Sequence, residues 1–214
     1  MHAGSPIRSV IPSLEGPVLS VLAGTTAPLS GRRVASLAGA SHPAATACLG
    51  RLARAGIVTA SPQGPSILYT ANREHLAWPA IEALANLRTK TLGLLRVTTS
   101  GWEVAPEAAL VFGSFARGDG DETSDIDMLF VRPAGLDDDP SRRRQWHEQL
   151  SSLGDLVERA TGNSVQLLDE DLPKLRRRLD AGDPILTSWA QDGIELTGRP
   201  LRHVLNTATT LELT

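Results

Sequence analysis

The sequence predicts an α/β (α+β) chain of two domains, residues 1–75 and 101–214, joined by a helical connector at residues 76–100. Helical patterns and one hairpin fill the first part, whereas apolar strand patterns alternate with helices in the second. The charge also changes sign, from +4 over the first 75 residues to −9 over residues 101–214. We therefore expect two domains with different partners, of which only the basic one suits a nucleic-acid backbone.

The composition is that of a globular protein. The chain has 214 residues, 41% of them hydrophobic and 21% charged, which suffices for one large core or two small ones. No apolar run approaches the roughly 18–20 residues that a membrane span needs, and the first residues lack the apolar stretch of a signal peptide. The single cysteine, Cys48, cannot form an internal disulfide, which suits a reducing compartment. We expect a cytoplasmic protein with no membrane partner.

The first 75 residues contain helix and hairpin signals in succession. After a loosely held arm at residues 1–12, helices are expected at residues 13–23, at residues 31–37 and from Ser41 to Gly56. Ser30 and Ser41 stand where a hydroxyl would cap the second and third helices. Two apolar runs, residues 57–61 and 66–70, flank a Pro-Gln-Gly-Pro turn, and this pattern predicts a hairpin.

The segments LSGRRVA (29–35) and LARAGIV (52–58), followed by the hairpin, resemble the winged helix-turn-helix of ArsR- and MarR-type regulators. The resemblance implies binding of double-stranded DNA, with the third helix in a major groove and arginines near phosphates. The DNA-binding residues so implied are Arg32, Arg33, Ser41, His42, Thr46, Arg51 and Arg54. The leading turn of that helix offers no Arg or Asn for bidentate reading of a base. A protein-docking or dimerisation module therefore remains an alternative.

Residues 73–97 carry leucines and isoleucine at roughly helical intervals, interrupted near the start by Trp78 and Pro79. They predict one long helical segment that connects the domains or makes a homodimer. Residues 98–106 are the expected linker.

A motif in the second part combines a glycine-serine turn with two nearby aspartates. The apolar run 108–112 predicts a buried strand, and Gly113 and Ser114 then open a short helix whose free N–H groups favour phosphate. The next predicted strand, residues 125–131, places Asp125 and Asp127 on the same face because side chains alternate along a strand. Two adjacent carboxylates repel each other unless a cation lies between them. The combination predicts a bound nucleotide with magnesium.

This motif, GSFARGDGDETSDIDML at residues 113–129, resembles the GSxARG…SDIDL signature of the nucleotidyltransferase superfamily, and most closely its minimal prokaryotic type. The resemblance covers about residues 100–200 and implies a small mixed sheet flanked by helices. It implies transfer of a nucleotidyl group from a nucleoside triphosphate, with Mg²⁺ or Mn²⁺ as cofactor. It assigns Asp125 and Asp127 as catalytic metal ligands. The nucleotide-binding residues that it implies are Gly113, Ser114, Arg117, Ser124 and Gln166.

The sequence departs from this family at the third carboxylate, which lies on a neighbouring strand and helps to deprotonate the acceptor hydroxyl. The matching run here is VQLLD, residues 165–169, so that Gln166 stands where the acid belongs. An amide is a weaker ligand for magnesium and cannot act as a base. Asp169 would face the other side of a regular strand. Three functions therefore stay open: a nucleotidyltransferase, a DNA-binding transcriptional regulator that senses nucleotide without turnover, and a regulatory partner of another protein.

The remaining elements are expected to surround these strands. A helix at residues 140–161 begins with Arg142, Arg143 and Arg144, which form a solvated first turn or contact a nucleotide phosphate or RNA backbone. A third strand is expected at residues 164–169 and a short basic helix at residues 172–181. Residues 185–205 contain another helix, a short segment at residues 193–198 and a final helical piece.

Overall fold

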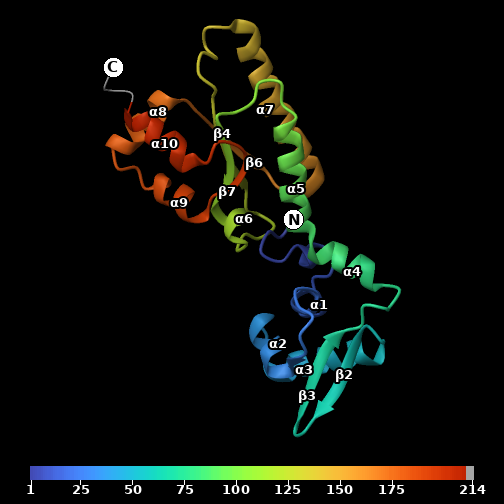
Figure 1. Cartoon of the computed structure of the whole chain (residues 1–214). Helices are drawn as coiled ribbons and strands as arrows, with labels where there is room; N and C mark the ends of the chain where they lie inside the picture. Colours follow the sequence, from blue (N-terminus) through green and yellow to red (C-terminus); the bar gives the residue numbers. More distant parts are fainter. Residues whose placement is uncertain (211–214) are drawn as a thin grey trace. The chain divides into compact units, whose positions relative to one another are not determined.

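The computed structural model describes residues 1–210, which divide into two compact units (Figure 1). One unit comprises His2 and residues 4–89, and the other comprises Met1, Ala3 and the chain from Lys90 onward. No helix within the described residues is long and apolar enough to cross a membrane.

The unit of residues 4–89 packs helices against a three-stranded antiparallel sheet. Its strands have the order β1-β3-β2, and the two-residue strand β1 had no signal in the sequence. The hydroxyls of Ser30 and Ser41 accept hydrogen bonds from the backbone N–H groups of Arg33 (3.3 Å) and Ala44 (3.4 Å), as the expected helix caps require. The elements are η1 (Pro6–Ser9), α1 (Glu15–Ala23), β1 (Leu29–Ser30), α2 (Gly31–Leu37), α3 (His42–Arg54), β2 (Val58–Gln63), β3 (Ser66–Ala71) and α4 (Trp78–Ala85).

The expectation of one long helix at residues 73–97 is wrong. Helix α4 ends at Ala85, and α5 (Leu87–Ser100) begins two residues later. Asn86 separates them with φ −95° and ψ 11°, outside the helical range. Asparagine is a weak helix former because its amide competes with the backbone for hydrogen bonds. The leucine periodicity continues across this break, which is why the sequence pattern did not reveal it.

The second unit is built on a four-stranded mixed sheet with the order β6-β5-β4-β7. Strand β5 pairs in parallel with β6, whereas β4 pairs antiparallel with both β5 and β7. The expected small mixed sheet is therefore present. Strand β7 is the short segment to which the sequence assigned no structure. The strands are β4 (Ala108–Phe112), β5 (Ile126–Val131), β6 (Val165–Glu170) and β7 (Ile194–Gly198).

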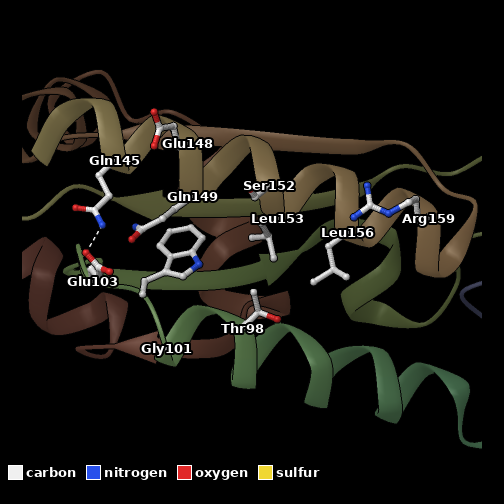
Figure 2. Close-up of a pocket in the computed structure, with 11 residues that line it drawn as sticks. Thr98, Gly101, Glu103, Gln145, Glu148, Gln149, Ser152, Leu153, Leu156 and Arg159 are labelled. Atoms are coloured by element: carbon white, nitrogen blue, oxygen red, sulfur yellow. Dashed lines mark hydrogen bonds between the residues drawn. The ribbon is translucent and has the colours of Figure 1, made fainter. Parts of the chain in front are cut away.

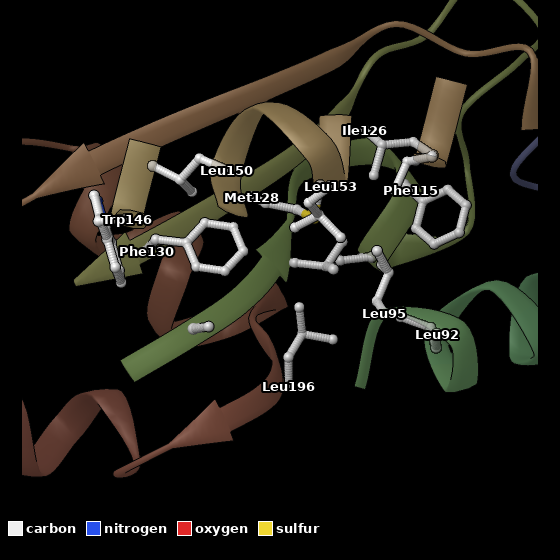
Figure 3. Close-up of a cluster of buried hydrophobic side chains, with 14 of the residues drawn as sticks. Leu92, Leu95, Phe115, Ile126, Met128, Phe130, Trp146, Leu150, Leu153 and Leu196 are labelled. Carbon is white, nitrogen blue, oxygen red and sulfur yellow. The ribbon is translucent and has the colours of Figure 1, made fainter. Parts of the chain in front are cut away.

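Helices cover both faces of this sheet (Figure 1). One face packs against α5 and α7 (Pro140–Thr161), where Met128 and Phe130 meet Trp146 and Leu150 (Figure 3). The opposite face packs against α8 (Leu172–Asp180), α9 (Ile185–Asp192) and α10 (Leu201–Thr210). The alternation along β5 sends Leu129 into this second core. Asp127, two residues before Leu129, therefore shares the face of α8, α9 and α10.

Candidate functional site

The glycine-serine turn and the aspartate pair meet where β4 ends and β5 begins. Phe112, the last residue of β4, is the register partner of Asp127 on β5. Helix α6 (Gly113–Arg117) starts at the next residue, and Gly113 has φ +71°. A Cβ atom at Gly113 would overlap Oδ2 of Asp127. Only glycine fits this position without strain and displacement, because it tolerates positive φ and leaves room for the carboxylate.

The two carboxylates differ in their surroundings. Asp125 is exposed just before the strand, whereas Asp127 is half-buried on it. Burial raises the pKa of Asp127, the negative charge of Asp125 raises that pKa further, and Arg117 opposes both effects. A divalent cation between the carboxylates would relieve this repulsion. Mg²⁺ is commonly held by one or two carboxylates together with substrate phosphates, so this donor set fits one such ion.

Arg117, at the end of α6, is held between two acids. Its Nε lies 3.0 Å from Oδ2 of Asp119, and an Nη atom lies 2.9 Å from Oδ2 of Asp192. Asp192 is the last residue of α9. This contact could not be predicted from the sequence, because the two partners are 75 residues apart. These two ion pairs position the guanidinium of Arg117, and its positive charge lowers the pKa of Asp127.

The loop between α6 and β5 folds back over Ser114. The carbonyl oxygen of Ser114 accepts hydrogen bonds from the N–H groups of residues 118, 119 and 120. A Cβ at Gly120 would lie 2.9 Å from the Ser114 hydroxyl oxygen, so that glycine is packed closely there. The hydroxyl of Ser124 donates to Oδ1 of Asp121 and accepts from its N–H, both at 3.0 Å. In this structure Ser124 shapes the loop, and its nucleotide-binding role stays a prediction.

Gln166 stands at the third ligand position, beside Asp127, as the sequence indicates. Gln166 is the register partner of Asp127 on the parallel strand β6, and it is exposed. Asp169 binds Arg132 at 2.8 and 2.6 Å and accepts from Nε1 of Trp146 at 3.1 Å. Trp146 belongs to the core beneath α7, so Asp169 faces away from the site as expected. In the described part of the chain, no three His, Cys, Asp or Glu residues form a group that could hold a metal ion.

The residues that the sequence assigned to DNA fall into two groups. Arg32, His42 and Thr46 line one cavity of about 490 Å³, together with Ser66 and Ile67 of β3. Ser41 caps α3, and Arg33 is exposed beside Arg32.

The other group lies toward the opposite end of α3. Arg51 pairs with Glu15 of α1 at 2.5 Å. Arg54 ends the helix, about 18 Å along its axis from His42 at 1.5 Å per residue. The structure therefore brings three of the seven assigned residues into one cavity, and the arginine at position 51 is engaged elsewhere.

A further cavity of about 540 Å³ lies between α5 and α7 (Figure 2). Leu153 and Leu156 of α7 and Thr98 of α5 lie on its walls, and Gln145 donates a hydrogen bond to Glu103 at one end. None of the residues that the sequence assigned to a site lines this cavity.

Comparison with known proteins agrees with the motif. Residues 100–169 match the family model of the nucleotidyltransferase domain. The matched residues include the glycine-serine turn, both aspartates and Gln166, so the candidate site lies within the segment that is similar to the nucleotidyltransferase domain.

Two solved structures are similar to part of this chain. A toxin–antitoxin crystallised with AMP-PNP is 18% identical, with a TM-score of 0.33, over 57% of this chain and 85% of that one. A putative nucleotidyltransferase from Sulfolobus solfataricus is 22% identical, with a TM-score of 0.29, over 53% of this chain and 86% of that one. No curated protein matches the chain. Neither structural likeness is close enough to assign a substrate.

Proposed function

We propose that the chain binds a nucleoside triphosphate with a divalent ion and transfers its nucleotidyl group to a hydroxyl of a protein, an RNA or a small molecule. One observation carries the proposal: the Gly113 turn lies directly against Asp127, whose pKa is raised by burial and by the charge of Asp125. A phosphate-binding turn next to paired carboxylates is what a triphosphate with its metal ion requires. The match of residues 100–169 to the nucleotidyltransferase domain supports the same reaction class.

The turn, the two aspartates and Arg117 have separate roles in this reaction. Asp125 and Asp127 would hold Mg²⁺ or Mn²⁺, which supplies positive charge to the phosphates. The backbone N–H groups of the turn and the Ser114 hydroxyl bind phosphate oxygens. Arg117 exchanges its contacts with Asp119 and Asp192 for the triphosphate, since a guanidinium pairs strongly with phosphate. The acceptor oxygen then bonds to the α-phosphorus, the bond from that phosphorus to the bridging oxygen breaks, and pyrophosphate leaves.

The acceptor proton has no carboxylate to receive it on β6. Gln166 occupies the place beside Asp127, and an amide cannot act as a base. The proton therefore passes to solvent or to a group of the acceptor, and turnover is slow without the correct acceptor. The alternative function follows from the same residue: a regulator that binds the triphosphate and releases it unchanged.

Labelled ATP, GTP, CTP and UTP separate these two functions. The full chain is incubated with each nucleotide and magnesium, alone and with cell extract, and both label transfer and pyrophosphate are measured. Transfer that disappears in the Asp125→Ala, Asp127→Ala double variant supports the transferase. The matched control replaces Asp155 and Glu158, two exposed acids of α7, and retains the activity. Nucleotide binding without label transfer or pyrophosphate contradicts the transferase and favours the regulator.

We also propose that residues 1–75 form a winged helix-turn-helix that binds double-stranded DNA. The proposal is favoured by the cavity that Arg32, His42 and Thr46 share with four residues of the β2–β3 hairpin. The net charge of +4 over these residues is suited to phosphate. A helix start and a hairpin that converge on one cavity would offer two elements to adjacent parts of a duplex.

Gel retardation of promoter DNA at rising salt tests this second proposal. Binding through phosphates falls steeply with salt, and each lost phosphate contact lowers the slope by about one. The Arg32→Ala, Arg33→Ala variant is expected to bind more weakly with a shallower slope. Replacing Arg142 and Arg143, which belong to the other unit, is the charge-matched control. Equal binding by both variants contradicts the proposed surface. Sedimentation of the same preparations tests the alternative that the helical segment at residues 73–97 makes a homodimer.

A further inference from the structure

Glu170, at the end of β6, has one carboxylate oxygen without a partner. The residue is 5% exposed. Its Oε1 accepts hydrogen bonds from Nε of Arg178 at 3.2 Å and from an Nη atom at 2.8 Å. Its Oε2 is buried and has no hydrogen-bond partner among residues 1–210. Leaving a buried acceptor unpaired is unfavourable, so such an atom in a native protein calls for a donor that the chain itself does not supply.

Glu170 is one of the residues that line a cavity of about 350 Å³, and cationic side chains form much of its wall. Its walls are Glu170, Lys174, Arg177, Arg178, Ala181 and Asp183. Arg178 is already engaged, because it pairs with both Glu170 and Asp183. Neither the ammonium of Lys174 nor the guanidinium of Arg177 has a carboxylate partner in the described chain. The ammonium donates to the carbonyl oxygen of Asp169 at 3.2 Å, and only the backbone N–H of Lys174 donates to Asp171. Two cations and one acceptor oxygen therefore remain for an occupant.

This cavity is separate from the proposed nucleotide site. Gln166 pairs with Asp127 near one end of β6, whereas Glu170 pairs with Val131 at the other end. Four residues of extended strand span about 13 Å. A molecule that binds beside Glu170 therefore does not occupy the place of the triphosphate.

We propose that this cavity binds a phosphate monoester that carries a free hydroxyl, such as a sugar phosphate. The phosphate pairs with Lys174 and Arg177. The carboxyl group of Glu170 turns toward the cavity on binding, because Oε2 is buried in the free protein, and the hydroxyl then donates its hydrogen bond to this oxygen. Phosphate is the anion that matches two neighbouring cations, and a cavity of this size accommodates a small ligand with a few converging polar groups. The buried carboxylate gives specificity, since a phosphate without a donor leaves Oε2 unpaired.

Ribose 5-phosphate and methyl phosphate are the two probes. Both monoesters are dianions above pH 7 because their second pKa is about 6, but only ribose 5-phosphate has hydroxyl groups. Titration calorimetry is performed without divalent ions on the full chain carrying Asp125→Ala and Asp127→Ala. This double variant lacks the proposed nucleotide site. A failure of the nucleotide proposal can therefore be distinguished from a failure of the proposal for the Glu170 cavity. Saturable binding of ribose 5-phosphate, at least about tenfold tighter than that of methyl phosphate, is the expected result.

Two further variants locate the binding. Lys174→Met with Arg177→Met should weaken the binding of ribose 5-phosphate by about tenfold or more. Arg142→Met with Arg143→Met, the same loss of charge on α7, should leave it unchanged. Glu170→Gln should abolish the preference for ribose 5-phosphate over methyl phosphate, with folding verified by thermal unfolding.

Three outcomes would overturn the proposal. The first is an absence of saturable binding of ribose 5-phosphate, and the second is binding that survives the loss of Lys174 and Arg177. The third is equal affinity for the two phosphates in the parent chain, which would remove the role of Oε2.

Discussion

At the scale of single residues, the site depends on a glycine that nothing larger can replace. Gly113 combines a positive φ with direct contact to Asp127. Positive φ alone is common among the glycines of this chain, for example at Gly162, where a Cβ would meet no atom within 4 Å. The contact with the carboxylate is thus what distinguishes Gly113.

The Gly113→Ala variant tests this distinction, with Gly162→Ala as its control. Both variants force a side chain into the left-handed region, which costs on the order of 1 kcal/mol of unfolding free energy. Only Gly113→Ala also displaces Asp127. We expect both to lose stability in chemical denaturation, and only Gly113→Ala to lose magnesium-dependent nucleotide binding. Retained binding in Gly113→Ala would show that the carboxylate does not depend on this close approach.

The raised pKa of Asp127 predicts how the stability of the folded chain depends on pH. Burial and Asp125 raise its pKa in the folded state above the ordinary value of 3.8. The folded state then binds more protons than the unfolded state between these two pKa values, so stability falls as pH rises through that window. Asp127→Asn removes this cost. The variant should be more stable than the parent near pH 7, with a difference that vanishes below about pH 3.8.

Urea unfolding at both pH values measures the difference. Asp155→Asn, a change of an exposed acid on α7, should show no such gain. A parent chain that is the more stable one near pH 7 would contradict the account of Asp127.

At the scale of elements, the sequence was most informative where its pattern is local. The strand at residues 108–112 and the helix at residues 140–161 have the predicted bounds, because five apolar residues in a row and a 3.6-residue periodicity are unambiguous. Strand β7 was missed as a strand, since its five residues, Ile194–Gly198, alternate weakly and gain their structure from β4. The break at Asn86 was missed for the converse reason, because the surrounding leucine pattern continues.

Some features of the candidate site could likewise be predicted from local sequence, and others could not. Asp125, Asp127 and the turn could be predicted, because they are close in sequence and share a strand face. The contact between Arg117 and Asp192 could not, since it depends on how α9 packs against the end of α6. The unpaired oxygen of Glu170 likewise depends on the position of Arg178 on the following helix.

The ion pair between α1 and α3 offers a test at this scale. The hydrogen bond from Arg51, assisted by Ser13, lowers the pKa of Glu15 to about 2 from an ordinary 4.5. Its stabilisation is therefore fully present above pH 4.5 and is lost as the pH falls toward 2. Glu15→Gln should lower stability slightly near pH 6, because the pair is largely exposed. The difference from the parent should shrink near pH 2.5, and a difference that is constant across this range would contradict the pairing.

At the scale of the whole molecule, the two units have separate cores. Cys48 and Leu49 are fully buried in the core of residues 4–89, and Leu129 is fully buried in the other unit. Burial, followed by the charge of Glu15, raises the pKa of the Cys48 thiol to about 11. Because the thiolate is the reactive form, Cys48 should resist alkylation until its own unit opens.

Alkylation of Cys48 near pH 8 therefore reports the stability of one unit. Leu49→Ala removes a buried side chain and should cost about 2–5 kcal/mol, with a correspondingly faster reaction. Leu129→Ala makes the same change in the other core and should leave the rate unchanged. If both variants accelerate alkylation equally, the units unfold together and the division into two fails.

We propose above all that Asp125 and Asp127 hold a divalent ion against a triphosphate bound at the Gly113 turn. The most direct test is the equilibrium affinity for a non-hydrolysable nucleoside triphosphate, measured with and without magnesium on the parent chain and on the Asp125→Ala, Asp127→Ala variant. We expect magnesium to tighten binding by the parent about tenfold or more, and to have no such effect on the variant. An affinity and a magnesium dependence that are the same in both proteins would contradict the claim.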